Sequence, residues 1–277
     1  MKKQSFNSQL SRRNFVKTTT AASLFSIVPA HVLGGNGKAS PSDKLNIAAV
    51  GLRGMGKENL KEMETENIVA LCDVDWGLAQ KTFDKYPDAK RYKDFRKMFE
   101  EQKDIDAVLV ATPDHTHAVV SMAAMDLGKH VYTQKPLTRT VYEARKLSEK
   151  ARDAQIVSQM GIQNHSGEGI RKICEWIWDG AIGSVHEVHI WTDRPVWPQN
   201  IPYRPEPMSI PPDLDWDLWI GPSPYREYNS LYHPHDWRGW WDFGTGALGD
   251  IGCHSMDFPF TALKLKYPTS VNASYDK

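Results

Sequence analysis

An aspartate and a histidine stand four residues apart in the glycine-rich stretch FGTGALGDIGCHSMD, residues 243–257. On a helix the side chains of Asp250 and His254 share one face, and Asp257 falls close to that face at the next turn. A histidine titrates near neutral pH and can exchange a proton with a substrate hydroxyl, which suits a general acid or base. Because the same spacing also occurs in ordinary ion pairs on helix surfaces, the pattern needs support from the rest of the chain.

A glycine-rich turn lies in the segment KLNIAAVGLRGMGKENL, residues 44–60, between an expected strand and an expected helix. Asp73 ends the next strand, 22 residues after Gly51. This order is typical of a dinucleotide site, where the helix N-terminus faces the pyrophosphate and the acid binds a ribose hydroxyl. Arg53 replaces the usual middle glycine, so either Gly54 takes over in a shifted turn or Arg53 contacts phosphate. The acid favours NAD, and Arg53 leaves NADP possible.

Strands and helices continue to alternate as far as about residue 163, which predicts a doubly wound parallel sheet of the α/β class. Ligands bind such sheets beyond the carboxyl ends of the strands, where the loops TPDHTH (112–117) and QKPL (134–137) stand. For His115 and His117 a capping and packing role near the cofactor is favoured over contact with substrate. The residues predicted to bind the cofactor are Gly51, Arg53, Gly54, Met55, Gly56, Asp73, Thr112, Pro113, His117, Gln134 and Lys135.

The motifs TPDHTH, QKPL and GALGDIGCHSMD together resemble the Gfo/Idh/MocA family of nicotinamide-dependent sugar and polyol oxidoreductases, and the exported branch of that family most closely. The resemblance covers roughly residues 44–277. It implies a Rossmann domain at 44–163 and an α/β substrate domain at 164–277. The second domain is expected to contain an open, mainly antiparallel sheet that forms one wall of the active site, and such a sheet is a possible surface for a homo-oligomer.

The resemblance also implies three catalytic residues. His254 is expected to act as acid and base on the hydroxyl that becomes a carbonyl, Lys135 to hydrogen-bond the same oxygen, and Asp250 to orient the substrate or the histidine. Gln134 departs from the glutamate usual in the family, which removes a carboxylate that would favour the charged ammonium of Lys135. Small residues such as Gly249 and Gly252 are expected to let nicotinamide and sugar approach the helix backbone.

Two segments of the second half carry further expectations. SVHEVHIWTDRP, residues 184–195, alternates like a half-buried strand. PTSVNASYDK, residues 268–277, looks like a strand, and family relatives continue past this point, so the chain is expected to be a fragment or a shortened member with an exposed sheet edge. YHPHDW, residues 232–237, raises the question of a metal, but no matching ligand set is evident elsewhere and no metal is predicted.

The N-terminus differs from the rest of the chain. Arg12 and Arg13 precede a short, mildly apolar stretch, which predicts a twin-arginine export signal at 1–34, a linker at 35–43 and a periplasmic protein. The alternative is an ordinary basic amphipathic arm. Lys plus Arg and Asp plus Glu both number 34, so bulk charge gives no reason to expect a nucleic-acid partner or, once the signal is removed, a membrane.

These observations predict an NAD(P)-dependent oxidoreductase that acts on a sugar or polyol hydroxyl and recycles a tightly bound cofactor. One alternative is an NAD-dependent glycoside hydrolase that works by transient oxidation and elimination, which would release a phenol from an aryl glycoside without net cofactor reduction. A weaker alternative is a sugar-binding protein without catalysis, which would bind sugar and exchange no hydride.

Overall fold

The computed structural model describes residues 40, 43–194 and 196–274. The chain divides into two units, residues 1–44 and 45–277. The predicted signal peptide at 1–34 lies outside the described residues, as does the predicted linker at 35–43 apart from positions 40 and 43.

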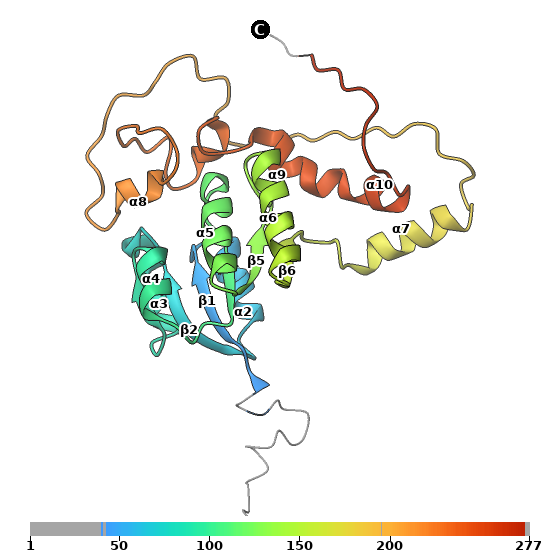
Figure 1. Ribbon diagram of the computed structural model, residues 1–277. Coiled ribbons are helices and arrows are strands. Elements are labelled where there is room, and N and C mark those ends of the chain that lie inside the picture. The colour runs from blue at the N-terminus through green and yellow to red at the C-terminus, as the bar shows by residue number, and fades with distance from the viewer. Residues whose placement is uncertain (1–39, 41–42, 195, 275–277) are drawn as a thin grey trace, which may run out of the picture. The chain divides into compact units, whose positions relative to one another are not determined.

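Six parallel strands form one sheet with the spatial order β3-β2-β1-β4-β5-β6 (Figure 1). The order changes direction beside β1, which is the crevice where doubly wound sheets bind ligands. The predicted Rossmann sheet is therefore confirmed. The strands are β1 (Asn46–Val50), β2 (Asn67–Cys72), β3 (Lys90–Tyr92), β4 (Ala107–Val110), β5 (His130–Gln134) and β6 (Ser158–Gly161).

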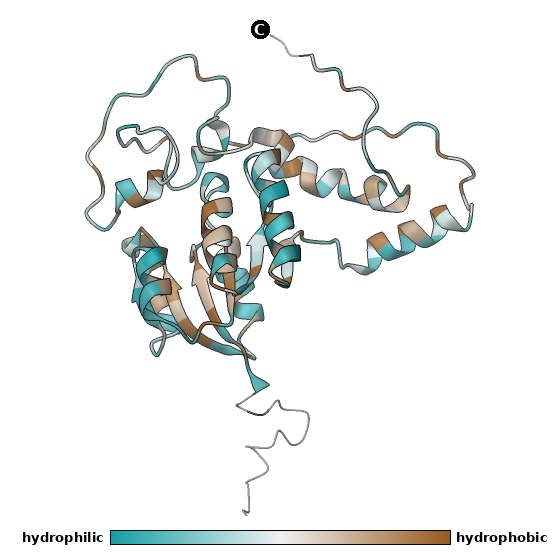
Figure 2. Ribbon diagram, in the orientation of Figure 1, coloured by the Kyte–Doolittle hydropathy of each residue, from teal (hydrophilic) through white to brown (hydrophobic). Residues whose placement is uncertain are grey.

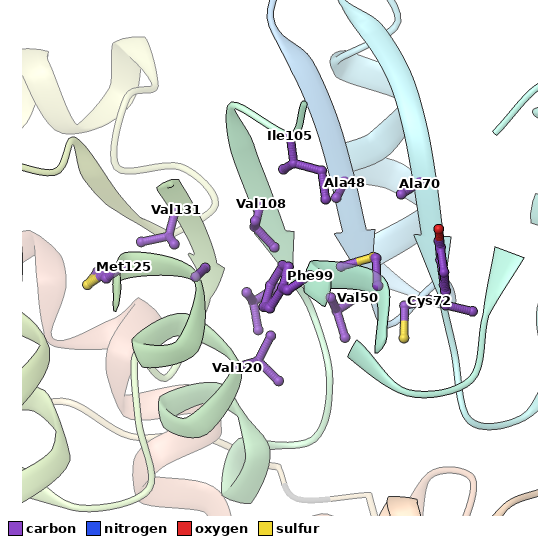
Figure 3. Close-up of a cluster of buried hydrophobic side chains, with 14 of the residues drawn as sticks. Ala48, Val50, Ala70, Cys72, Phe99, Ile105, Val108, Val120, Met125 and Val131 are labelled. Carbon is purple, nitrogen blue, oxygen red and sulfur yellow. The ribbon is translucent and has the colours of Figure 1, made fainter. Parts of the chain in front are cut away.

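Helices cover both faces of this sheet because successive residues of each buried strand point to opposite sides. On one face Val50 and Val108 pack against Phe99 and Val120, which belong to two different helices (Figure 3). The other face buries Leu71 and its neighbours. Figure 2 shows the strands as apolar and the outer sides of the helices as largely polar. The helices are α2 (Met55–Glu62), α3 (Trp76–Lys85), α4 (Phe95–Glu101), α5 (Asp114–Asp126) and α6 (Val141–Asp153).

Three of these helices begin at residues whose side chains accept a hydrogen bond from the first turn. Asp75 caps α3 and Asp94 caps α4. Thr140 forms a capping box with Glu143 at the start of α6. A side-chain cap satisfies one of the free N–H groups of the first turn and is worth about 1 kcal/mol, so these positions fix where each helix starts.

After β6 the described residues contain helices and turns but no strand. The segment 184–194, predicted as a strand, has no paired neighbour, and that prediction is wrong because a strand needs a partner for its backbone groups. Helices α7 and α10 pack against each other through Ile170, Cys174 and Ala262. The elements of this half are α7 (Glu168–Trp178), α8 (Trp216–Ile220), the 3₁₀ helix η2 (Asp236–Gly239), α9 (Gly246–Ser255) and α10 (Asp257–Ala262).

A buried aromatic cluster links α8, η2 and the chain between them. Trp216 stacks on Trp219 with ring centroids 4.6 Å apart, and Phe243 meets Trp219 edge-on at 4.8 Å. Such pairs add to the stabilisation that burial of their area already provides. The cluster lies beside the start of α5, where His115 packs against both Trp219 and Phe243. None of the helices in the described part of the chain combines the length and the apolar character that crossing a membrane requires.

Candidate active site

The glycine-rich loop between β1 and α2 packs too closely for side chains at two of its positions. Gly51 has φ +86°, and a Cβ there would stand 2.5 Å from the carbonyl oxygen of Ala111. A Cβ on Gly56 would stand 2.0 Å from the carbonyl oxygen of Gly51. Gly54 differs, because a Cβ there would meet no atom within 4 Å, and its φ is +49°. Gly54, the residue before α2, and Arg53 both line the same cavity, so both alternatives for this turn stay predictions.

Asp73 follows β2 and contacts the same loop. Its carboxylate accepts the N–H of Leu52 at 2.8 Å and the N–H of Asp75 at 2.9 Å, one on each oxygen. Burial raises the pKa of Asp73, and these two hydrogen bonds oppose the rise. Each oxygen retains a second lone pair, so the carboxylate can still accept a hydrogen bond from a hydroxyl in the cavity that it lines.

Thr112 and His117 come from the loop after β4 and the first turn of α5. The Thr112 hydroxyl is buried and has no hydrogen-bond partner among the described residues, although Thr112 lines the cavity. His117 is buried, with Nδ1 2.7 Å from the Pro136 carbonyl oxygen and Nε2 2.7 Å from the Thr112 carbonyl oxygen. Both ring nitrogens of His117 are therefore engaged by backbone, and the ring ties the loop after β4 to the loop after β5.

Lys135 follows β5 directly and reaches α9. Its Nζ forms an ion pair with Oδ1 of Asp250 and donates to the Asp250 carbonyl oxygen at 2.9 Å. Both side chains are only 13% exposed. A mostly buried ammonium needs such a partner, because an unpaired charge away from water is costly. Asp250 thus supplies the carboxylate that the glutamine at position 134 does not.

The start of α9 is held by Asp114, the first residue of α5. Oδ2 of Asp114 accepts the Thr245 hydroxyl at 2.7 Å and the Thr245 N–H at 3.1 Å. A Cβ on Gly249 would stand 2.0 Å from the Thr245 hydroxyl oxygen, and one on Gly252 would meet only the side chains of Leu248 and Met256. Gly249 thus makes room for the Thr245 side chain, and Gly252 faces neighbouring side chains. That these glycines also let cofactor and sugar approach the helix backbone stays a prediction.

His254 lies one turn beyond Asp250 on α9 and is partly buried. Burial lowers the pKa of His254 and the nearby Lys135 charge lowers it further, against the opposing effects of Asp250 and of a backbone hydrogen bond with Gln163. A neutral imidazole keeps one ring nitrogen that can accept a proton.

Gln134 connects this region to α2. Its amide nitrogen donates to Oδ1 of Asn59, and its amide oxygen accepts Nε2 of Gln163 at 3.3 Å. Gln134 is buried, so an uncharged amide that both donates and accepts suits the position. The side-chain amides of Asn59, Gln134 and Gln163 thus form a hydrogen-bonded row that begins on α2.

One cavity of about 310 Å³ joins most of the predicted positions. Two predicted residues are absent from its lining: Gly56 packs beneath the loop, and His254 stands one turn away on α9. The predicted residues that line the cavity are Gly51, Arg53, Gly54, Met55, Asp73, Thr112, Pro113, His117, Gln134, Lys135 and Asp250. The open Gly54 position and the unpartnered Thr112 hydroxyl fit a dinucleotide that brings its own polar groups.

The opposite wall of the cavity contains residues that the sequence did not single out as site residues. His233 is buried and its Nε2 lies 2.7 Å from Oδ2 of Asp75. Burial raises the pKa of Asp75, but the hydrogen bonds from His233 and the Leu78 amide outweigh it and hold the pKa below its usual value. Arg238 lies nearby in the same wall. The stretch YHPHDW and the arginine that follows it are their only sequence signal, and that signal suggests no role for the histidines other than metal ligation.

Two models of one protein family match the chain. The model described as "Oxidoreductase family, NAD-binding Rossmann fold" matches residues 45–162, and the model described as "Oxidoreductase family, C-terminal alpha/beta domain" matches residues 189–272. The first match spans the six-stranded sheet and the glycine-rich loop. The second includes the stretch that contains Arg238, Asp250 and His254.

Curated proteins resemble about half of the chain. Inositol 2-dehydrogenase of Salmonella typhimurium is 28% identical over 151 residues, which is 52% of this chain and 45% of that protein. Levoglucosan dehydrogenase of Pseudarthrobacter phenanthrenivorans is 29% identical over 154 residues, 56% of this chain and 32% of that protein. The chain thus spans less than half the length of these relatives.

The crystal structure of an oxidoreductase domain protein from Kribbella flavida is similar over 80% of this chain and 54% of that chain, with a TM-score of 0.54 and 24% identity. At this identity the likeness shows the fold alone. The sheet, the glycine-rich loop, the Lys135–Asp250 pair and both family models agree, and the chain belongs to the Gfo/Idh/MocA oxidoreductase family, with an NAD-binding Rossmann domain at residues 45–162.

Proposed function

We propose that the protein is an NAD(P)-dependent oxidoreductase that acts on a sugar or polyol hydroxyl. The observation that carries this proposal is the Lys135–Asp250 pair in the wall of the cavity that the glycine-rich loop also lines. The names of the relatives, inositol 2-dehydrogenase and levoglucosan dehydrogenase, support a polyhydroxylated substrate.

His254, Lys135 and Asp250 each have a different role in the proposed oxidation. NAD(P), when bound, accepts the hydride that leaves the carbinol carbon. His254, neutral because its pKa is lowered, takes the hydroxyl proton on its free ring nitrogen. The Lys135 ammonium stabilises the negative charge that develops on the same oxygen. Asp250 holds Lys135 in place through its carboxylate and its carbonyl oxygen.

Hydride exchange tests this proposal directly. Protein loaded with NAD would be incubated with sugars and polyols that carry deuterium on the carbinol carbon, and the label in the nicotinamide would be measured by mass spectrometry. Transfer of deuterium supports the oxidoreductase. Release of phenol from an aryl glycoside without net reduction would point instead to hydrolysis by transient oxidation, and sugar binding without any exchange would contradict catalysis.

We further propose that the protein is exported by the twin-arginine route and keeps its cofactor throughout. The support is the Arg12–Arg13 pair with its following apolar stretch, together with the small supply of free dinucleotide expected outside the inner membrane. Replacement of both arginines by lysine should leave the protein in the cytoplasm. Fractionation that finds the lysine variant in the periplasm at the normal level would refute the export proposal and leave the oxidoreductase proposal standing.

A further inference from the structure

Arg238 lies in the cavity wall near Asp250, and most of its N–H donors have no hydrogen-bond partner among the described residues. It lines the cavity, and its Nε lies 3.8 Å from Oδ1 of Asp250, which is too far for a hydrogen bond. Its Nη1 donates to the His235 carbonyl oxygen at 2.9 Å. The described residues provide no other hydrogen bond to this guanidinium, so most of its five N–H donors are available to a ligand.

Aromatic packing holds the guanidinium in one orientation. Arg238 lies over the Trp237 ring at 4.2 Å from its centroid and within 5.9 Å of the Trp197 ring. A guanidinium stacked on an aromatic face is preorganised, so it loses little freedom when it binds a planar partner. Gly244 makes this position possible, because a Cβ there would stand 2.6 Å from the backbone of Arg238.

Three carboxylates act on Arg238 electrostatically, but none is given a hydrogen bond to its guanidinium among the described residues. Lys135 takes the hydrogen bonds of Asp250, the carboxylate nearest to both cations. Oδ2 of Asp114 is bound by Thr245, and Oδ1 of Asp236 lies 2.8 Å from Nδ1 of His235. Burial lowers the pKa of Arg238, and the charge of Arg194 lowers it further. A partly buried cation without a full partner is costly, and an anionic ligand would remove that cost.

We propose that Arg238 binds a carboxylate of the substrate, so that the oxidised compound is a sugar acid or polyhydroxy acid rather than a neutral sugar. A carboxylate can take two parallel hydrogen bonds from a guanidinium, which adds geometric specificity to charge. Phosphate of the dinucleotide is the competing anion. The position of Arg238 favours the substrate carboxylate over the dinucleotide phosphate, because Arg238 lies beside Asp250 and Lys135. Arg53 lies in the glycine-rich loop next to Gly54 and acts electrostatically on Asp75, so it is the cation better placed for phosphate. This inference rests on the proposed oxidoreductase function.

The test compares matched acids and neutral compounds on the full chain loaded with NAD: glucuronate with glucose, galacturonate with galactose, and gluconate with glucitol. Both hydride transfer and equilibrium binding by calorimetry would be measured. The wild type should prefer at least one acid over its neutral partner. Arg238→Met keeps an apolar stem over Trp237 and should lower that preference about 10- to 100-fold, the range expected for a charge-assisted bond. Arg238→Lys should restore part of it.

Arg53→Gln is the matched control, a cation removed from the other end of the same cavity. It should weaken NAD binding and leave the ratio between acid and neutral compound unchanged. Equal use of acids and neutral compounds by the wild type, or an Arg238→Met effect confined to NAD affinity, would overturn the inference. If no compound exchanges hydride, the proposed function fails, and the calorimetric preference still decides the role of Arg238. If Arg238→Met does not fold, the preference of the wild type and of Arg238→Lys for acids over neutral compounds still tests the inference.

Discussion

The side chains of the candidate site differ in their contacts and in the roles proposed for them. Lys135 and Asp250 form the mostly buried ion pair, and His254 stands one turn beyond with a lowered pKa. Both ring nitrogens of His117 face backbone carbonyl oxygens, which agrees with the packing role near the cofactor that the sequence favours. The roles assigned to these residues in binding and catalysis stay predictions, and the following two experiments examine His254.

Replacing His254 by alanine should lower kcat for hydride transfer by about 10² to 10⁴, the usual contribution of a general acid or base. Binding of NAD should change little, because His254 does not line the cavity. His186→Ala is the matched control, an exposed histidine outside the site that should have no effect. Full activity of His254→Ala on every substrate of the parent would refute the assigned role.

The pH profile of kcat/KM should reflect the environment of His254. The base must be neutral, so oxidation falls as the pH drops through its pKa. Because burial and the Lys135 charge lower that pKa, the acid limb should lie below the ordinary histidine value of about 6.5. An NMR titration of His254 in Lys135→Met should show a higher pKa, since a repelling cation is gone. A pKa that stays the same or falls in that variant would contradict the electrostatic explanation.

At the level of helices and loops, the Rossmann domain and the second half of the chain meet at the first turn of α5. His115 Nε2 lies 2.9 Å from the Trp219 carbonyl oxygen, and the His115 N–H donates to the Phe243 carbonyl oxygen at 3.2 Å. Asp114 holds the start of α9. Two adjacent residues of one helix thus position both α8 and α9, and with α9 the residues proposed for catalysis.

Stability should depend on pH through His115. Burial lowers the pKa of His115 to about 4, against hydrogen bonds to Trp219 and Phe243 that favour the charged ring. Between the unfolded value of about 6.5 and pH 4 the unfolded chain binds more protons, so His115 contributes about 3 kcal/mol above pH 6.5 that is lost as the pH falls to 4. Urea unfolding should show this loss in the wild type and a smaller loss in His115→Gln.

Exposed His186 provides the control for that experiment, because His186→Gln should keep the full pH dependence. Other groups, carboxylates above all, titrate in the same range, so the comparison uses the difference between variants. Identical curves for His115→Gln and the wild type would show that the buried ring does not set the acid stability.

Gly56→Ala should push α2 away from the glycine-rich loop that follows β1. The new Cβ would stand 2.0 Å from the Gly51 carbonyl oxygen, so the backbone must shift, at a cost of about 1–3 kcal/mol. NAD affinity should fall at least tenfold, because the backbone shift also moves the glycine-rich loop that is predicted to bind the pyrophosphate. Gly169→Ala in α7 is the control: its Cβ meets nothing within 4 Å, and alanine favours a helix. Calorimetry and thermal melting measure both variants, and an unchanged Gly56→Ala protein would refute this packing.

For the molecule as a whole, the cavity draws its walls from widely separated parts of the chain. The glycine-rich loop lies on one side and the segment from His233 to Arg238 on another, joined by the buried Asp75–His233 pair. We therefore expect slow ligand release, since affinity differences reside mainly in dissociation rates. It is consistent with the proposal of a retained cofactor.

The full chain should therefore purify with near-stoichiometric dinucleotide that survives prolonged dialysis. His233→Ala should speed dinucleotide release at least tenfold, because it removes the pair that ties the His233–Arg238 segment to Asp75. His189→Ala, at an exposed position, should leave the rate unchanged. Release would be followed by the fluorescence of NADH. Protein that emerges free of cofactor and needs added NAD(P) at every turnover would refute retention and leave the family assignment standing.

The sequence by itself determined the parallel sheet and the glycine-rich loop, because each follows from a local pattern. It singled out Lys135 and Asp250 through the resemblance of their motifs to the family. Strand periodicity, positive-φ glycines and the exit of a strand into a loop depend on neighbours in sequence. Only the tertiary structure decided how Asp250 pairs with Lys135, why Gly249 accommodates Thr245, and that Arg238 and His233 belong to the cavity wall. Gly249 and Thr245 are neighbours on one helix turn, but the Lys135–Asp250 and Asp75–His233 pairs join residues more than a hundred positions apart. No local pattern encodes which distant groups a folded chain brings together.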